Sequence, residues 1–273
     1  MWFQNKLRLF WWDEVKIQRK KFQNYGDLIG RYLVEKISGK EVRWVQPSAF
    51  SIFNWFSSIY VTVGSILTHI NKNCIVWGSG IISKEYTISY AHFLAVRGPQ
   101  TRKHLIAQGF EVPEIYGDPA LLMPSYFNPN IQKKYEYGII PHYNDMHLVK
   151  DWFKGSSDVF IIDLMTNDVE AKTIEILSCK KNISASLHGV IVAHAYQIPA
   201  VWQKFSDKVF GDDIKYQDYM ESVAIPFYKP TVRTVEYTYE ELNELFETYP
   251  SLPLLKSIEN LKKGLMAVCP FKN

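Results

Sequence analysis

The sequence is poor in cysteine, with only Cys74, Cys179 and Cys269 among its 273 residues. Three cysteines so far apart form neither a disulfide framework nor the paired spacing of a structural zinc site, and such usage is typical of a reducing compartment. No uninterrupted apolar run reaches the roughly 18 residues of a membrane-spanning helix. The N-terminus, MWFQNKLRLFWWDE, lacks the apolar core and cleavage site of a signal peptide. We therefore expect a cytoplasmic protein, either free or attached to a membrane surface.

A large excess of one charge is also lacking. The formal net charge is +3, from 31 basic and 28 acidic residues. Proteins that bind nucleic acid usually carry a stronger and clustered basic excess, so nucleic acid is not an expected partner. The hydrophobic content of 47% excludes a disordered chain, and the length is sufficient for two domains of ordinary size.

Short β-rich runs alternate with helical patterns along most of the chain. This rhythm is typical of βαβ units and therefore of parallel sheets. The predicted strands cover residues 42–45, 59–63, 74–77, 93–96, 114–116, 137–140, 159–164, 182–185 and 200–202. The predicted helices cover residues 27–38, 98–108, 145–154 and 168–179, with another beginning near residue 187.

A polar stretch at residues 128–134 (NPNIQKK) interrupts the alternation and is interpreted as a linker. We therefore predict an α/β fold in which two Rossmann-like domains, residues 1–127 and 128–228, face each other across a cleft. Residues 229–273 are predicted to form a helical C-terminal tail. Its helices are expected at 239–247 and 254–266, separated by Pro250 and Pro253.

Six predicted turns between strands and helices combine glycine or proline with polar residues. Ligands of parallel α/β sheets bind at the carboxyl ends of the strands, so these turns are the places to look for a site. They lie at residues 24–27 (NYGD, after a strand-like run at 15–22), 78–80 (GSG), 97–101 (RGPQT), 117–119 (GDP), 141–145 (PHYND) and 186–189 (SLHG).

Each turn also has a purely structural interpretation. Asn24 and Asp27 fit an Asx-turn and a helix cap, and Asp118 with Pro119 fits a plain helix start. The turn Gly78-Ser79-Gly80 serves either a tight connection or a phosphate cradle. Single histidines such as His142 and His194 are more often structural than catalytic.

The turn at residues 186–189 is the most unusual, because an apolar helical run opens with Leu187-His188-Gly189. A buried helix gains no stability from a histidine and a helix-weakening glycine in its first turn. A helix N-terminus favours anions, and a glycine allows a ligand to approach the backbone. We therefore expect Ser186 and these three residues to form an anion site.

Taken in order, these strings resemble the polysaccharide pyruvyltransferases. Single pieces are unspecific, but the ordered set is characteristic of that family. The matching strings run from about residue 24 to 223 and comprise NYGD (24–27), WGSG (77–80), VRGPQT (96–101), GDPALL (117–122), IPHY (140–143), SLHG (186–189), IPAVW (198–202) and KYQDY (215–219).

The resemblance implies a reaction and a fold. Members transfer the enolpyruvyl unit of phosphoenolpyruvate to two hydroxyls of one sugar, which forms a cyclic pyruvate ketal and releases phosphate. Their fold is similar to the two-domain GT-B type of glycosyltransferases. The implied acceptor is a repeat unit of a bacterial surface polysaccharide (exopolysaccharide or capsule), carried on a polyprenyl diphosphate at the inner face of the cytoplasmic membrane. No cofactor and no metal are implied.

The resemblance also suggests how the donor is held. An arginine, a histidine and a lysine of the family hold phosphoenolpyruvate, and they correspond to Arg97, His188 and either Lys208 or its competitor Lys204. Many members carry arginine directly before Leu-His, where this chain has Ser186. His142 or Lys215 could supply the missing charge.

The chemistry of the donor agrees with this set. Arginine suits a bidentate grip on a carboxylate or phosphate, and the amides of Gly80 and Gly189 add hydrogen-bond donors. We expect His188 to be both a donor ligand and the general acid/base, two roles that sequence does not separate. Asp118 or Asp27 is expected to accept a hydroxyl proton or to position the sugar.

Two groups of aromatic residues have alternative interpretations. Tyr143, Trp202, Tyr216 and Tyr219 either stack on the sugar or belong to the core. The N-terminal aromatics either dip into an anionic membrane with their basic neighbours or pack under the first sheet. That N-terminal group comprises Trp2, Phe3, Phe10, Trp11 and Trp12 with Lys6, Arg8, Lys16, Arg19, Lys20 and Lys21.

Two rival functions remain at this point. A nucleotide-sugar glycosyltransferase of GT-B shape would need a late glutamate facing the ribose, and no candidate follows the Leu-His-Gly helix. A non-catalytic glycan-binding protein would not need the set of Arg97, His188 and a lysine. Pyruvyl transfer is therefore the favoured prediction.

Overall fold

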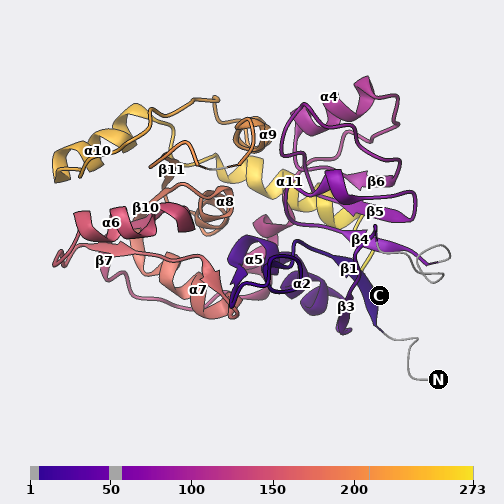
Figure 1. Cartoon of the computed structure of the whole chain (residues 1–273), viewed down its shortest axis with the longest axis horizontal. Coiled ribbons are helices and arrows are strands. Elements are labelled where there is room, and N and C mark those ends of the chain that lie inside the picture. The colour runs from indigo at the N-terminus through magenta and orange to yellow at the C-terminus, as the bar shows by residue number, and fades with distance from the viewer. Residues whose placement is uncertain (1–5, 49–56, 209, 273) are drawn as a thin grey trace.

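The computed structural model describes residues 6–48, 57–208 and 210–272 (Figure 1). The strands are β1 (Leu7–Phe10), β2 (Gln23–Asn24), β3 (Val42–Trp44), β4 (Ile59–Val61), β5 (Cys74–Trp77), β6 (His92–Ala95), β7 (Tyr135–Ile140), β8 (Val159–Ile161), β9 (Met165–Thr166), β10 (Cys179–Ser184) and β11 (Ala200–Trp202). The helices are α1 (Glu14–Gln18), α2 (Tyr25–Ser38), α4 (Pro99–Ala107), α5 (Met123–Tyr126), α6 (Met146–Trp152), α7 (Val169–Leu177), α8 (Leu187–Ala195), α9 (Ile214–Ser222), α10 (Tyr239–Thr248) and α11 (Leu255–Ala267). Short 3-10 helices are η1 (Leu67–His69), η2 (Pro119–Leu122) and η3 (Tyr143–Asp145).

The first sheet has five parallel strands in the order β3-β1-β4-β5-β6. Its strands are short apolar runs such as CIVW in β5, as expected where helices cover both faces of a parallel sheet. β1 was not predicted as a strand, yet it lies between β3 and β4. The N-terminal aromatics Phe10 and Trp11 are consequently buried, at 1% and 5% exposure. The packing interpretation of these two residues is therefore correct, while Trp2 and Phe3 lie outside the described residues.

The second sheet has four parallel strands in the order β11-β10-β7-β8. The predicted parallel α/β class is confirmed. Residues 128–134, interpreted as a linker, contain neither helix nor strand. The domain boundaries given above stay predictions.

Helix α2 and the strand before it connect the two sheets. β2 pairs antiparallel with β9, and the amide of Tyr25 donates to the carbonyl of Leu164 at 2.8 Å. The hydroxyl of Tyr25 lies 2.7 Å from that of Thr173 on α7. Buried residues of both sheets, including Trp77 and Ile140, belong to one hydrophobic cluster. These contacts fix the start of α2 against the second sheet, and the shared cluster fixes the residues of the two sheets relative to each other.

The predicted C-terminal helices are confirmed, and they pack on different sheets. On α10, Asn243 accepts a hydrogen bond from the Tyr137 hydroxyl of β7. On α11, the carbonyl of Leu265 accepts from the indole of Trp77 in β5 at 2.9 Å. In Figure 1, the yellow helix α11 accordingly runs toward the strands of the first sheet.

Two predicted strands were wrong. Residues 15–22 include most of helix α1, because the Asp13 side chain caps its start by accepting from the amide of Lys16 at 2.8 Å. Residues 114–116 form only an isolated bridge between Tyr116 and Val96. Across the described residues, no helix has the length and apolar character needed to cross a bilayer.

Candidate functional site

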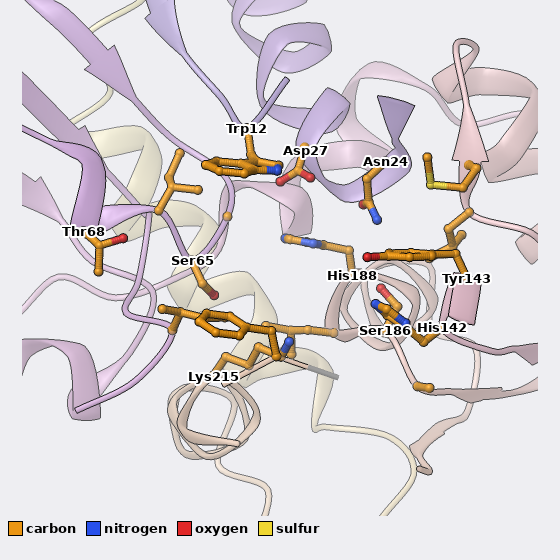
Figure 2. Close-up of a pocket in the computed structure, with 18 of the residues that line it drawn as sticks. Trp12, Asn24, Asp27, Ser65, Thr68, His142, Tyr143, Ser186, His188 and Lys215 are labelled. Carbon is orange, nitrogen blue, oxygen red and sulfur yellow. The ribbon is translucent and has the colours of Figure 1, made fainter. Parts of the chain in front are cut away.

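A cavity of about 700 Å³ opens where strands of both sheets end. Trp12 follows β1, Ser65 follows β4, His142 follows β7 and Ser186 follows β10, and all four line it. Figure 2 shows these side chains around the cavity with Asn24 and Asp27 of the α2 start and Lys215 of α9. This location agrees with the rule that ligands of parallel sheets bind at the carboxyl ends of strands.

Helix α8 presents an uncapped N-terminus to the cavity. Ser186 is its N-cap residue, but the Ser186 side chain makes no hydrogen bond into the helix. Instead, the turn is held by Ser184, whose hydroxyl accepts from the Ser186 amide at 3.0 Å and donates to the Ser186 carbonyl at 2.8 Å. The first amides of a helix have no intrahelical acceptor, so this end of α8 can bind an anion.

His188 lies in the first turn of α8 and is held from two sides. Its Nε2 is 3.4 Å from Oδ2 of the fully buried Asp118. Within the described residues, neither of these two atoms has a hydrogen-bond partner. On the other side, a Cβ at residue 26 would lie 2.1 Å from Nδ1 of His188, so Gly26 leaves the room that the imidazole occupies. The ring is therefore oriented by the starts of η2 and α2.

Asp118 and Asn24 also have structural roles. Oδ1 of Asp118 accepts from the amide of Ala120 at 2.9 Å and so caps η2. The side chain of Asn24 accepts from the amide of Gly26 at 2.9 Å and caps α2. Both capping interpretations are confirmed, and Asn24 lines the cavity as well.

Asp27 lies in the first turn of α2 and faces the same cavity. Burial raises the pKa of Asp27 to about 7, while the neighbouring His188 acts in the opposite direction. A carboxyl group that titrates near neutral pH can exchange protons with a substrate under physiological conditions.

Lys215 is the one lysine or arginine among the described residues that line this cavity. It lies in the first turn of α9. Burial and, to a smaller extent, the nearby charge of Arg97 lower the pKa of Lys215 to about 8, while Asp213 and Asp27 act in the opposite direction. Across residues 6–48, 57–208 and 210–272, its ammonium forms no ion pair, and its nearest aromatic contact is the Tyr216 ring at 5.3 Å.

The two lysines favoured from sequence do not line the cavity. Lys204 pairs with Asp213 at 2.5 Å, and Lys208 is exposed. Three lysines within twelve residues thus lie in three different environments, and Lys215 is the one whose charge is available to an anion in the cavity.

Arg97 is fully buried and lies behind the cavity wall. Its Nε donates to Asp218 at 3.0 Å, its Nη2 to the carbonyl of Ile81 at 2.8 Å and its Nη1 to Ser65 at 2.5 Å. The direct contact with phosphoenolpyruvate that the resemblance implied for Arg97 stays a prediction.

The Gly78-Ser79-Gly80 turn lies behind the same wall. The hydroxyl of Ser79 and the amide of Gly80 both donate to the carbonyl of Gly64, at 2.7 and 3.0 Å. Because Gly64 and Ser65 line the cavity, this turn supports the wall and does not itself line it. Its predicted role in binding substrate is untested.

The remaining candidates divide between cavity and core. Burial lowers the pKa of His142 to about 4, so this cavity residue is neutral at pH 7 and adds no positive charge. Tyr143 lines the cavity and is 42% exposed. His194 is buried and bonded to Tyr219 and to the carbonyls of Ala200 and Ser251. The core also contains Trp202, Tyr216 and Tyr219.

Several cavity residues were missed from sequence. Trp12 was considered only as a membrane or packing residue, because β1 before it was not recognised. Ser65 and Thr68 follow the predicted strand at 59–63, so the rule on strand ends could have found them. Asp163 likewise lies in the connection after β8.

Comparison with known proteins identifies the family of this chain. A family model described as polysaccharide pyruvyl transferase matches residues 5–202, which include Trp12, Asp118 and His188. An uncharacterized protein of Acanthamoeba polyphaga mimivirus is 34% identical over 209 residues, covering 74% of this chain and 71% of that protein. The chain therefore belongs to the polysaccharide pyruvyl transferase family, whose members are pyruvyl transferases.

Proposed function

We propose that this protein transfers the enolpyruvyl group of phosphoenolpyruvate to two hydroxyls of one sugar in a surface polysaccharide repeat unit. The products are a cyclic pyruvate ketal and phosphate, and no cofactor takes part. One observation carries the proposal: the ammonium of Lys215, which has no ion pair within the described part of the chain, lines one cavity together with the uncapped start of α8 and the imidazole of His188.

The donor is an anion with two acidic groups, a carboxylate and a phosphate. A site for it needs a cation and oriented N–H donors. Lys215 supplies the cation and the first amides of α8 supply the donors. We therefore assign the donor lysine to Lys215 in preference to Lys208 and Lys204.

His188 is placed to move the proton that starts the reaction. Its imidazole lies 3.4 Å from the Asp118 carboxylate, and in its protonated form it gives a proton to the methylene carbon of the donor. The central carbon becomes oxocarbenium-like and a sugar hydroxyl adds to it. The bond to phosphate then breaks, and the second hydroxyl closes the ring.

The protons balance over the whole reaction. The two sugar hydroxyls lose one proton each. One of these protons restores the proton that His188 gave to the methylene carbon, which is now a methyl group, and the other leaves with phosphate. Asp27, with a pKa of about 7, is suited to accept a hydroxyl proton in its carboxylate form.

The acceptor is proposed to enter beside Trp12 and Tyr143, whose ring faces can stack on a sugar.

We propose a polyprenyl-diphosphate-linked acceptor, a GT-B-like arrangement of the two sheets and action at the inner face of the cytoplasmic membrane. Lys20 is paired with Glu14 at 2.9 Å and lies over the Tyr143 ring at 4.1 Å, whereas the adjacent Lys21 and Phe22 are exposed. The exposed Lys21 and Phe22 are the candidates for contact with an anionic membrane. No observation favours a nucleotide-sugar glycosyltransferase.

Calorimetric titration with phosphoenolpyruvate tests the donor assignment. We expect saturable binding that weakens roughly 10- to 100-fold in Lys215→Ala, because a charged hydrogen bond to the donor is lost. Lys208→Ala, the exposed lysine seven residues away, serves as the comparison and should bind like the wild type. Binding of uridine diphosphate without phosphoenolpyruvate binding would move the protein to the glycosyltransferases.

The pH dependence of that affinity tests Lys215 a second way. Its pKa of about 8 means that the ammonium is present below that pH and is lost above it. We expect affinity to fall by up to about tenfold per pH unit above pH 8. Lys215→Arg stays charged and should remove this fall. An unchanged pH profile in Lys215→Arg would rule out Lys215 as the titrating group.

Turnover of His188→Ala tests the catalytic assignment. We expect the rate of phosphate release with a lipid-linked glycan acceptor to drop by at least about 100-fold, because general acid–base catalysis is lost. Circular dichroism should show an unchanged fold. His92→Ala, an exposed histidine on β6, is the matched control and should keep full activity. Full turnover by His188→Ala would contradict the assignment.

A further inference from the structure

Ser65 was not among the site residues predicted from sequence, and its hydroxyl lines the cavity. It follows β4 in the Gly64–Ser65 loop, and Figure 2 shows its oxygen pointing into the cavity. The oxygen accepts a hydrogen bond of 2.5 Å from Nη1 of Arg97. In the part of the chain that the structure describes, nothing accepts a hydrogen bond from this hydroxyl.

The guanidinium that holds Ser65 is itself fixed from its other sides. Asp218, also fully buried, accepts from Nε at 3.0 Å, and the carbonyl of Ile81 accepts from Nη2 at 2.8 Å. Asp218 is anchored in turn by the amide and hydroxyl of Thr101, at 2.8 and 2.6 Å. A Cβ at Gly80 would lie 2.4 Å from Cζ of Arg97, so backbone closes the remaining side. These contacts direct Nη1 at Ser65.

This arrangement determines what the hydroxyl can do. A serine hydroxyl has one proton and two lone pairs, and a cationic N–H occupies a lone pair here. The proton must then point away from the guanidinium and is left for a ligand. A cationic donor also polarises the O–H bond, which strengthens its bond to an anion. Lys215 lines the same cavity and interacts with the charge of Arg97, while Asp27 and Asp163 contribute carboxyl groups to the lining.

We propose that Ser65 donates a hydrogen bond to an anionic oxygen of the donor substrate, and that Arg97 is a positioning residue that acts through Ser65. The inference rests on the proposed function, because it takes phosphoenolpyruvate as the ligand. It differs from the contact that the resemblance implies, in which Arg97 itself holds the donor.

Calorimetry of phosphoenolpyruvate binding to Ser65→Thr and Ser65→Val tests the hydroxyl. Threonine and valine have the same shape, so the pair differs only in the O–H group. We expect valine to bind the donor roughly 10- to 100-fold more weakly than threonine, the loss of a hydrogen bond to a charged group. Ser178→Ala, which removes a hydroxyl bonded to the carbonyl of Glu175 outside the cavity, should bind like the wild type.

A double-mutant cycle with Ser65→Ala and Arg97→Lys tests the positioning role. If Arg97 acts through Ser65, Arg97→Lys should weaken binding in the wild-type background and change it by less than about twofold in the Ser65→Ala background. A purely structural effect or a direct contact of Arg97 with the donor would persist in both backgrounds and would overturn this role.

The outcomes separate the inference from the proposed function. Equal affinity of the threonine and valine variants overturns the role of Ser65 while phosphoenolpyruvate remains the donor. Failure of the wild type to bind phosphoenolpyruvate overturns the proposed function and the inference with it. The Ser65 pair alone decides the role of the hydroxyl if Arg97→Lys does not fold.

Discussion

The imidazole of His188 lies against the backbone of Gly26, and this close contact joins helix α8 of the second sheet to helix α2, which packs on the first. Any side chain at residue 26 would occupy the place of the ring. The contact depends on the pairing of β2 with β9 and on the bond from Tyr25 to Leu164, which hold the start of α2 beside the second sheet. The position of the His188 imidazole thus depends on the packing between the elements of the two sheets.

The charged groups in the cavity lower the stability of the protein when no ligand is bound. Lys215 is partly buried and has no ion pair among the residues that the structure describes, and burial raises the pKa of Asp27 to about 7. Isolated charges and perturbed carboxyl groups destabilise a fold, and they concentrate at functional sites where a ligand offsets the cost. An anionic donor beside Lys215 and a sugar hydroxyl beside Asp27 would do so here.

Local patterns predicted those parts of the site that depend on neighbours in sequence. The alternation of strands and helices indicated parallel sheets, the Leu-His-Gly turn indicated the start of α8, and Asn24 indicated a cap. β1 was missed because its run, LRLF, sits among aromatic and basic residues that also suit a membrane surface. The ion pair of Arg97 with Asp218 joins residues 121 positions apart, which no local pattern contains. Local sequence likewise does not distinguish Lys215 from Lys208. The fold places Lys215 at the cavity and leaves Lys208 exposed.

A crystal structure of the complex with phosphoenolpyruvate would test the central claim most directly. We expect the donor in the cavity at the carboxyl ends of the strands, with its anionic oxygens within hydrogen-bonding distance of the Lys215 ammonium and of the first amides of α8. Its methylene carbon should face His188. A donor bound outside this cavity, or held without Lys215 and the start of α8, would contradict the account.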